Sequence, residues 1–344
     1  MRRYREYIVK ERRKSSVKNV NLDNIGLVDL HLHLDGSLSL ETVKELMCMQ
    51  GIKNENTDEE LLKRLQVSHE CKDLNEYLEK FEYPLTLLQT GEALSFAVYK
   101  LIEELKSEGI IYAEIRFAPQ LHTKKGMSQK MAVEAAVRGL NQSSLDAGLI
   151  LCCMRGNDNH AENMETVETA EKYLGKGVVA IDLAGAEGLF PTKDFRDIFE
   201  LAREKHIPFT IHAGEADNPT SVEYALKFGA KRIGHGVRSV ENADTLKKLS
   251  YGGITLELCP TSNLNTNIYE NINEYPIKKL MDAGVKVTIN TDNMMVSGTD
   301  IKKELTMLAD TFGFDEDDII DFERNAIMAA FTSASHKEKL LRLL

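Results

Sequence analysis

The chain has 344 residues, of which 42% are hydrophobic and 28% charged, a composition typical of a folded domain with a sizeable core. The formal net charge of −11 argues against a nucleic-acid-binding surface, which needs a basic footprint. No apolar run reaches the roughly 18 residues that cross a bilayer, so we expect no membrane partner.

The first residues of the chain differ in charge from the rest. The first 18 carry eight Lys or Arg and two Glu, and they lack the apolar stretch of a secretory signal. We predict a solvated basic arm over residues 1–20, with a docking segment as the alternative. Residues 21–344 are then expected to form a single domain.

The cysteine pattern bears on the compartment. The chain has five cysteines, an odd number, and no two of them are spaced as C-x-x-C. This is not the pattern of a disulfide framework or of a structural zinc knuckle. Free thiols favour a reducing compartment, and we therefore predict a cytoplasmic location.

Taken in chain order, short apolar segments alternate with helical patterns. The predicted strands, which are apolar and often β-branched, are Ile25–His33, Ile110–Ala118, Leu149–Arg155, Val178–Gly185, Pro208–Glu215, Arg232–Gly236, Ile254–Pro260 and Lys286–Asp292. The predicted helices are Ser128–Ala147, Ala161–Leu174, Lys193–Lys205, Ser221–Phe228, Glu241–Ser250, Tyr275–Ala283, Asp300–Phe312, Asp315–Phe331 and the tail to Leu344. Eight such alternations predict an α/β fold, a (β/α)8 TIM barrel. An open doubly wound sheet is the alternative, but no G-x-G-x-x-G follows the first strand.

The connection from Leu34 to Gly109 is far longer than a usual strand-to-helix link, so extra helices are expected after the first strand. Within it, apolar residues recur at steps of four and three, namely at Leu74, Leu78, Phe81, Leu85 and Leu88. This spacing predicts one amphipathic helix with a bend at Pro84. The helix either packs on the barrel or forms a lid, in which case Leu78 and Phe81 would line the pocket.

Four potential metal ligands fall in or at the ends of predicted strands. His31 and His33 are separated by one residue, so their side chains point to the same side of the first strand. His212 lies in the fifth predicted strand, and Asp292 ends the eighth. The C-terminal strand ends of a barrel form one face, and a buried aspartate there needs a partner or a metal. We predict that these residues bind one catalytic Zn²⁺ per chain, the alternative being that each is satisfied separately by hydrogen bonds.

The chain resembles the adenosine deaminase family of metal-dependent hydrolases from about residue 25 onward. The motifs that carry the resemblance occur in the family's order and are His31–Gly36, Tyr112–Phe117, Asp182–Glu187, His212–Glu215, Arg232–Gly236 and Asn290–Asn293. The resemblance implies zinc-dependent deamination of adenosine, and of 2′-deoxyadenosine, to inosine and ammonia in purine salvage. The implied partner is a small-molecule purine nucleoside, and the oligomeric state is left open.

The resemblance also implies a role for each site residue. The zinc ligands would be His31, His33, His212 and Asp292. Glu215 would protonate purine N1, and His235 would handle the proton of the metal-bound water and steady the developing alkoxide. Asp292 would also orient that water. The residues expected to contact substrate are His33, Asp35 on the ribose hydroxyl side, Gly185 through its backbone N–H, and Asn293.

Asn293 departs from the pattern, because some family members carry a second aspartate here. Purine N7 is an acceptor, so its partner must donate, and an asparagine amide donates at any pH whereas a carboxylate must first be protonated. We favour a contact between Asn293 and N7. A turn residue without a substrate contact is the alternative.

Other substrates and functions are weighed against adenosine. Asp35 is expected near the 5′ end of the ribose, where its charge would repel the phosphate of AMP. The family patterns also imply that Asp35 together with Gly234 favours a nucleoside over adenine as substrate. A 5′-modified adenosine stays open. Two-metal relatives of this fold usually bridge their metals with a modified lysine on the fourth strand. The fourth predicted strand, Val178–Gly185, contains no Lys, which favours a single metal. A non-catalytic binding protein on this barrel is the remote alternative, because the ligands and both catalytic residues are all present.

Overall fold

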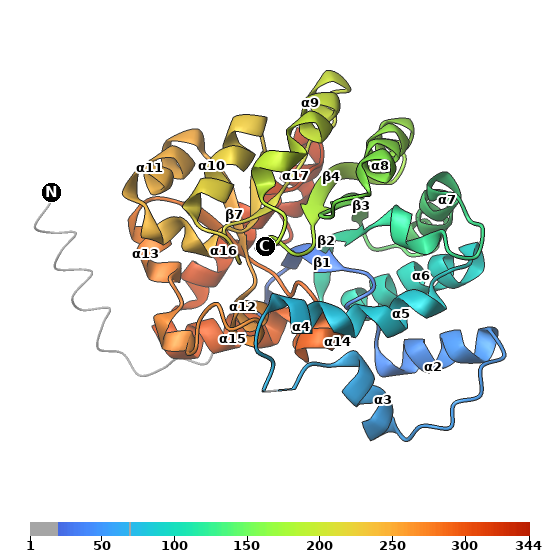
Figure 1. Ribbon diagram of the computed structural model, residues 1–344. Helices are drawn as coiled ribbons and strands as arrows, with labels where there is room; N and C mark the ends of the chain where they lie inside the picture. The colour runs from blue at the N-terminus through green and yellow to red at the C-terminus, as the bar shows by residue number, and fades with distance from the viewer. Residues whose placement is uncertain (1–19, 69) are drawn as a thin grey trace, which may run out of the picture.

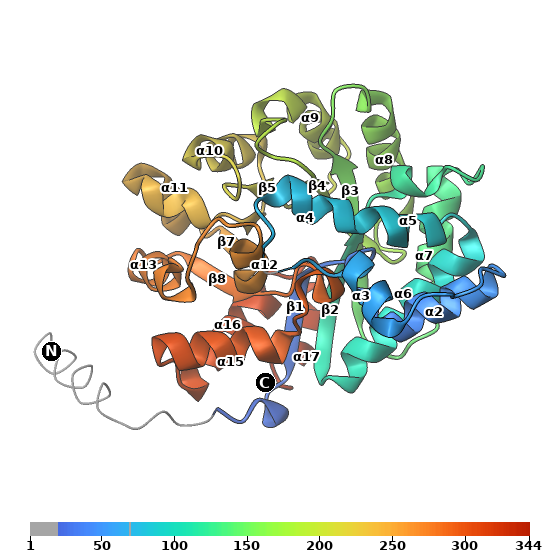
Figure 2. The ribbon, with the colours of Figure 1, turned by 60° about the horizontal axis from the view of Figure 1, so that its bottom comes forward.

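The computed structural model describes residues 20–68 and 70–344, and its strands form a parallel barrel inside a ring of helices (Figures 1 and 2). The strands of this described part are β1 (Leu27–His33), β2 (Ile110–Phe117), β3 (Ala147–Met154), β4 (Val178–Ala184), β5 (His212–Ala213), β6 (Arg232–His235), β7 (Thr255–Leu258) and β8 (Lys286–Ile289). Each overlaps one of the eight predicted strands, and the predicted (β/α)8 fold is confirmed. The predicted basic arm lies outside the described residues apart from Val20, and the division into an arm and a single domain stays a prediction.

Two backbone contacts close the barrel. Parallel ladders join β1 to β4 in chain order, and β5 to β8 in the same way. The gap between β4 and β5 is bridged by Ile181 and Phe209, and the gap between β8 and β1 by Leu32 and Asp292. The N–H of Asp292 donates to the carbonyl of His31 at 2.8 Å. This closure excludes the open doubly wound sheet, and it places Asp292 directly beside β1.

The fifth strand is much shorter than the predicted Pro208–Glu215, because only His212 and Ala213 enter a regular ladder. The chain leaves the strand at Gly214, whose φ of +69° is a left-handed conformation that suits glycine. A Cβ at this position would lie 2.6 Å from Val222 Cγ2. The early turn lifts Glu215 out of the sheet and over the barrel mouth.

The helices follow the predicted alternation. From Gly91 onward, the α-helices are α6 (Gly91–Ser107), which ends the long first connection, α7 (Gln129–Leu140), α8 (His160–Tyr173), α9 (Arg196–Glu204), α10 (Pro219–Phe228), α11 (Ala243–Gly252), α12 (Pro260–Asn265), α13 (Ile277–Asp282), α14 (Met294–Ser297), α15 (Ile301–Phe312), α16 (Glu316–Ala329) and α17 (Ala334–Leu340). Short 3₁₀ turns are η1 (Leu22–Asn24), η3 (Pro119–His122), η4 (Thr192–Phe195), η5 (Val237–Glu241) and η6 (Ile272–Glu274). The predicted helix Ser128–Ala147 ends early, at Leu140, and β3 begins at Ala147, so residues 141–146 form the turn between them.

The long first connection contains the expected extra helices. They are α2 (Leu40–Met49), α3 (Asp58–Leu65), α4 (Leu74–Leu78), the 3₁₀ turn η2 (Glu79–Phe81) and α5 (Glu82–Leu87). Helical structure runs without a gap from Leu74 to Leu87, as predicted, but the departure from α-helical geometry falls at η2 and not at Pro84. Pro84 sits in the first turn of α5, where its missing N–H costs no helical hydrogen bond. Figure 2 shows α4 and α5 lying over one end of the barrel.

The apolar core lies between the barrel and its helices, whereas the barrel interior holds charged groups. Ile115 of β2 and Leu183 of β4 are fully buried in the core. Arg116, Asp182 and Glu257, on β2, β4 and β7, are also fully buried. Because they are buried, these charges need partners inside the barrel.

Within the described residues, no helix is both long enough and apolar enough to cross a membrane.

Candidate active site

A cavity of about 210 Å³ lies at the C-terminal ends of the strands and gathers the predicted site residues. From the predicted set it is lined by His33, Asp35, Gly185, His212, Glu215, His235, Asp292 and Asn293. Leu78 and Phe81 of the inserted segment also line it, as predicted. A larger cavity of about 850 Å³ opens at the opposite end of the strands and contains no predicted site residue among those described. The smaller cavity is therefore the candidate active site.

The four predicted metal ligands converge on one point. His31 Nε2 lies 3.0 Å from His212 Nε2, and His33 Nε2 lies 3.2 Å from the same atom. Asp292 Oδ1 is 3.4 Å from the Nε2 atoms of both His31 and His33. Zinc bonds of 2.0–2.1 Å in a tetrahedron put ligand atoms about 3.3 Å apart. The donor set and its spacing therefore fit a zinc ion.

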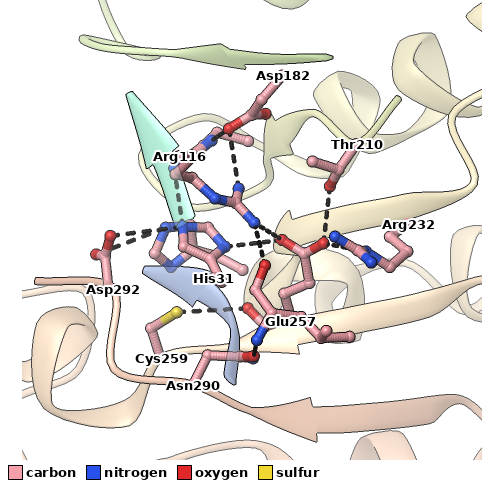
Figure 3. A network of polar contacts seen from close by, with 12 residues as sticks. His31, Arg116, Asp182, Thr210, Arg232, Glu257, Cys259, Asn290 and Asp292 are labelled. Carbon is pink, nitrogen blue, oxygen red and sulfur yellow. Dashed lines mark hydrogen bonds and ion pairs between the residues drawn. The ribbon is translucent and has the colours of Figure 1, made fainter. Parts of the chain in front are cut away.

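Buried carboxylates hold two of the imidazoles in orientation. The Nδ1–H of His31 donates to Glu257 at 2.8 Å, and His212 Nδ1 lies 2.8 Å from Asp182. Arg116 links these two carboxylates through contacts of 2.9 Å to Asp182 and 3.0 Å to Glu257, as Figure 3 shows. With Nδ1 engaged from behind, each Nε2 lone pair faces the common point.

The charge of Glu257 is stabilised from two sides. Burial opposes its ionisation, but the guanidiniums of Arg116 and Arg232 hold the pKa of this carboxyl well below its ordinary range. Thr210 also donates to Glu257, at 3.0 Å. Sequence reasoning missed Glu257 entirely. Arg116 and Asp182 lay in matched motifs but received no role, and the signal that could have found them is a charged residue inside an otherwise apolar strand.

Asp292 and His235 share an unusual backbone conformation. Their φ angles are +59° and +57°, in the left-handed region that non-glycine residues rarely occupy. Such strained residues are typical of functional sites, where the surrounding structure enforces them. Ser262 donates to Asp292 Oδ2 at 2.6 Å, which leaves Oδ1 directed toward the histidines.

Glu215 and His235 face each other across the cavity. Burial, reinforced by the nearby charge of Asp292, raises the pKa of Glu215 well above its ordinary value, which favours the protonated carboxyl. Burial lowers the pKa of His235 well below its ordinary value, which keeps the imidazole neutral. His235 Nε2 lies 3.7 Å from Glu215 and 4.0 Å from Asp292. The pair thus combines a proton donor and a neutral imidazole in one pocket.

Asn263 of α12 selects the tautomer of His235. Tyr275 donates to Asn263 Oδ1 at 3.1 Å, which leaves the amide nitrogen to donate to His235 Nδ1, also at 3.1 Å. With Nδ1 accepting, the proton of the neutral ring sits on Nε2 and points into the cavity. This arrangement suits donation to an oxygen that develops negative charge.

The helix α12 is anchored by a buried carboxyl that titrates near neutrality. Glu304 accepts the Thr261 N–H at 3.0 Å and the Thr299 hydroxyl at 2.6 Å, and burial raises its pKa to about 7 from an ordinary 4.5. A carboxyl with a raised folded-state pKa stabilises the fold fully below the unfolded pKa, and that stabilisation is lost as pH rises through the folded pKa.

Glu304→Gln should therefore make stability less dependent on pH. The uncharged isostere escapes the loss, so we expect its free energy of unfolding, relative to the original chain, to rise by about 2–3 kcal/mol between about pH 5 and pH 8. Urea unfolding of both proteins at the two pH values measures this. Other buried acids are common to both proteins and cancel in the difference. An unchanged difference would contradict the prediction.

The predicted substrate-contacting residues take separate places on the wall. Asp35 is nearly buried, and burial raises its pKa to about 6. Gly185 adopts a φ of +106°, and its position on the wall brings backbone close to the cavity. Asn293 Oδ1 is buried without a partner, and a Cβ at Gly36 would lie only 1.9 Å from it. Gly36 therefore leaves the room that Asn293 occupies.

The remaining wall is apolar and comes largely from the inserted segment. Besides Leu78 and Phe81, it contains Leu74, Tyr77, Leu85, Ala118, Leu121, Met154 and Ala184. The Tyr77 hydroxyl lies 2.7 Å from Ser297 Oγ, which fastens α4 to α14. One side of the cavity is thus polar and the other apolar, which is the usual make-up of a small-molecule site.

A parallel (β/α)8 barrel with three imidazoles and a carboxylate converging at its mouth defines the class of metal-dependent hydrolases. The comparisons are more specific. The sequence model described as "Adenosine deaminase" matches residues 27–344. The chain therefore belongs to the adenosine deaminase family.

Individual relatives agree with this assignment. A protein of Haemophilus ducreyi named adenosine deaminase is 49% identical over 94% of this chain and 96% of its own length. Among solved structures, an adenine deaminase from Arthrobacter aurescens superposes with a TM-score of 0.84 at 24% identity, covering 93% of this chain and 98% of its own. An amidohydrolase with bound Zn from Burkholderia ambifaria gives 0.82 at 21% identity, covering 92% and 89%. At these identities the two structures support the fold alone.

Proposed function

We propose that this protein is an adenosine deaminase that hydrolyses adenosine, and 2′-deoxyadenosine, to inosine and ammonia. The observation that carries the proposal is the Glu215 carboxyl facing a His₃Asp donor set across one cavity, where burial raises its pKa. Membership of the family and the similarity to the Haemophilus ducreyi enzyme support it.

The proposed metal is a single Zn²⁺ held by His31, His33, His212 and Asp292. Their spacing fits the ion, and the buried carboxylates behind His31 and His212 supply the orientation that catalytic histidine ligands require. When bound, zinc would lower the pKa of water to about 7 and so supply a nucleophile at neutral pH.

Glu215 and His235 perform the proton chemistry in this proposal. Protonated Glu215 donates to purine N1, which makes C6 a better electrophile. Water adds at C6, with Asp292 orienting it and His235 donating through Nε2–H to the oxygen that becomes negatively charged. Handling of the water's own proton by His235 would need the opposite tautomer, in which Asn263 turns its amide oxygen toward Nδ1. One proton of the added water passes to the 6-amino group, which leaves as ammonia while C6=O forms, and the other restores the Glu215 carboxyl, so that the product keeps a proton on N1.

Substrate selection follows from the rest of the wall. Asp35 is proposed to bind the ribose hydroxyl side, Gly185 to offer its N–H to the purine, and Asn293 to donate to N7. His33, a metal ligand on the wall, is proposed to border the bound nucleoside. No lysine or arginine occurs among the described residues that line the cavity. An anionic Asp35 without a compensating cation disfavours a 5′-phosphate.

The proposal is tested by measuring ammonia release from adenosine, adenine, AMP and a 5′-modified adenosine. We expect ammonia release from adenosine and not from the other three compounds, and only while the metal is bound. Chelation should lower the release to background, and added Zn²⁺ should restore it. Release mainly from adenine or from the 5′-modified nucleoside would replace the proposed substrate and keep the chemistry. Zinc binding without release from any of the four would leave a non-catalytic protein.

We also propose a cytoplasmic location and a place in purine salvage. All five cysteines are free, and four of them are buried. A protein without disulfides suits a reducing compartment. Deaminating free nucleosides there would return their bases to nucleotide synthesis.

A further inference from the structure

Glu187 binds the backbone of the loop that carries Glu215. Its Oε1 accepts the N–H of Gly214 at 2.7 Å, and its Oε2 accepts the N–H groups of Glu215, Ala216 and Asp217 at 3.0, 2.8 and 3.0 Å. Four consecutive backbone donors thus converge on one carboxylate. Such a run of N–H groups, turned by the left-handed Gly214, forms an anion-binding concavity.

The arrangement is buried and reinforced. Glu187 is 1% exposed, and Ser221 of α10 donates to its Oε1 at 2.5 Å. The same loop is held from the other side by Arg238, whose Nε donates to the carbonyl of Glu215 at 2.9 Å and whose N–H donates to the carbonyl of Gly214 at 3.0 Å. The backbone of Glu215 is therefore fixed on both faces.

The Glu215 side chain itself has few restraints. Its carboxyl has a long contact of 3.4 Å from Asn263 and lies 3.7 Å from His235. Its position over the cavity is therefore set mainly by the backbone that Glu187 holds. A proton donor must lie within hydrogen-bond reach of its acceptor, and small misplacements of reacting groups are costly.

We propose that Glu187 is a positioning residue for the proton transfer to the substrate ring. It touches neither substrate nor metal and acts by fixing the loop 214–217. The inference rests on the proposed function, in which Glu215 delivers a proton to N1.

The test is Glu187→Gln in the full chain. Whichever way the amide is turned, an NH₂ group replaces one of the two accepting oxygens. At least one of the four backbone N–H groups then loses its acceptor. We expect kcat with adenosine to fall by about tenfold or more, with the zinc content unchanged. The affinity for 1-deazaadenosine, which has carbon in place of N1, should stay within about twofold, because this ligand cannot use the proton of Glu215.

A double-mutant cycle with Glu215→Gln shows whether Glu187 acts through the proton donor. In that background Glu187→Gln should have almost no further effect on the residual rate. Loss of the same factor in both backgrounds, or weakened binding of 1-deazaadenosine, would overturn the proposal in favour of a general structural role.

Glu323→Gln is the matched control. Glu323 is equally buried and accepts the N–H of Val28 at 2.8 Å, near the start of β1 and far from the cavity. Its replacement should leave kcat unchanged whatever its effect on stability. If the original chain fails to deaminate adenosine, the proposed function fails. If it succeeds and Glu187→Gln retains full kcat, only the present inference fails.

Discussion

Glu215→Gln should lower kcat for adenosine by about 10²- to 10⁴-fold, the range that general acid catalysis usually contributes. The amide keeps the shape of the side chain and can still donate a hydrogen bond, but it cannot transfer a proton to N1. Burial and the charge of Asp292 raise the pKa of the native carboxyl, which favours the protonated form that the transfer needs. Steady-state rates with adenosine measure the effect.

Metal content separates lost chemistry from a lost site. Glu215 is not one of the proposed ligands, so the variant should retain as much zinc as the original chain. The Glu323→Gln protein serves as the reference for replacing a buried glutamate elsewhere. A Glu215→Gln enzyme with normal kcat would rule out Glu215 as the proton donor, and one that loses its zinc would make it part of the metal site.

The proton chemistry also predicts how activity depends on pH in the proposed mechanism. Glu215 is active when protonated, and because its pKa is raised, activity should fall as pH rises through that raised pKa and not already near the ordinary pKa of a glutamate. The pH profile of kcat/KM for adenosine measures this. The alkaline fall should be absent from the residual rate of Glu215→Gln, and its persistence there would assign it to another group.

The sequence was sufficient for the elements that local patterns encode. Short apolar segments between Gly, Pro and polar residues identified all eight strands, and their alternation with helices identified the barrel. Site residues such as His31 and His33 could be found because their spacing places both on one side of a strand. The motifs then gave the order in which the site residues occur.

Other features depend on contacts between distant parts of the chain. The fifth strand is short because the residues before it make only an isolated bridge to β4, between Phe209 and Ile181, and the chain then turns at Gly214. The break in the inserted segment at Glu79–Phe81 has no Gly or Pro to announce it. Periodicity predicts an amphipathic helix there, but it does not distinguish a short 3₁₀ stretch from regular α-helix.

The charged groups behind the histidines were the least predictable part of the site. Glu257 lies 226 residues from its partner His31, and it sits in a strand that otherwise reads as apolar. No local pattern links the two. A buried charge in such a strand indicates that a partner exists, but only the closed barrel shows which one.

Arg116→Met should lower the free energy of unfolding by about 3–5 kcal/mol, because it leaves the buried charges of Asp182 and Glu257 without their shared partner. Arg232 still reaches Glu257, so Asp182 should suffer most. Denaturant unfolding measures the loss. Arg324→Met, which breaks an exposed ion pair with Asp321, is the control and should cost less than about 1 kcal/mol.

The same variant should also bind zinc more weakly, because Arg116 holds in place the two carboxylates that orient His212 and His31, and losing such orientation usually costs about 10- to 100-fold in metal affinity. The two effects have different causes and can be separated. Adding Asp182→Asn and Glu257→Gln to Arg116→Met removes the unpaired charges, so stability should recover. Zinc affinity, measured by competition with a chelator, should not recover, because neutral amides orient His212 and His31 less strongly than carboxylates. If stability and zinc affinity both recover in the triple variant, Arg116 serves stability alone. If Arg116→Met loses neither stability nor zinc affinity, Arg116 has no part in the metal site.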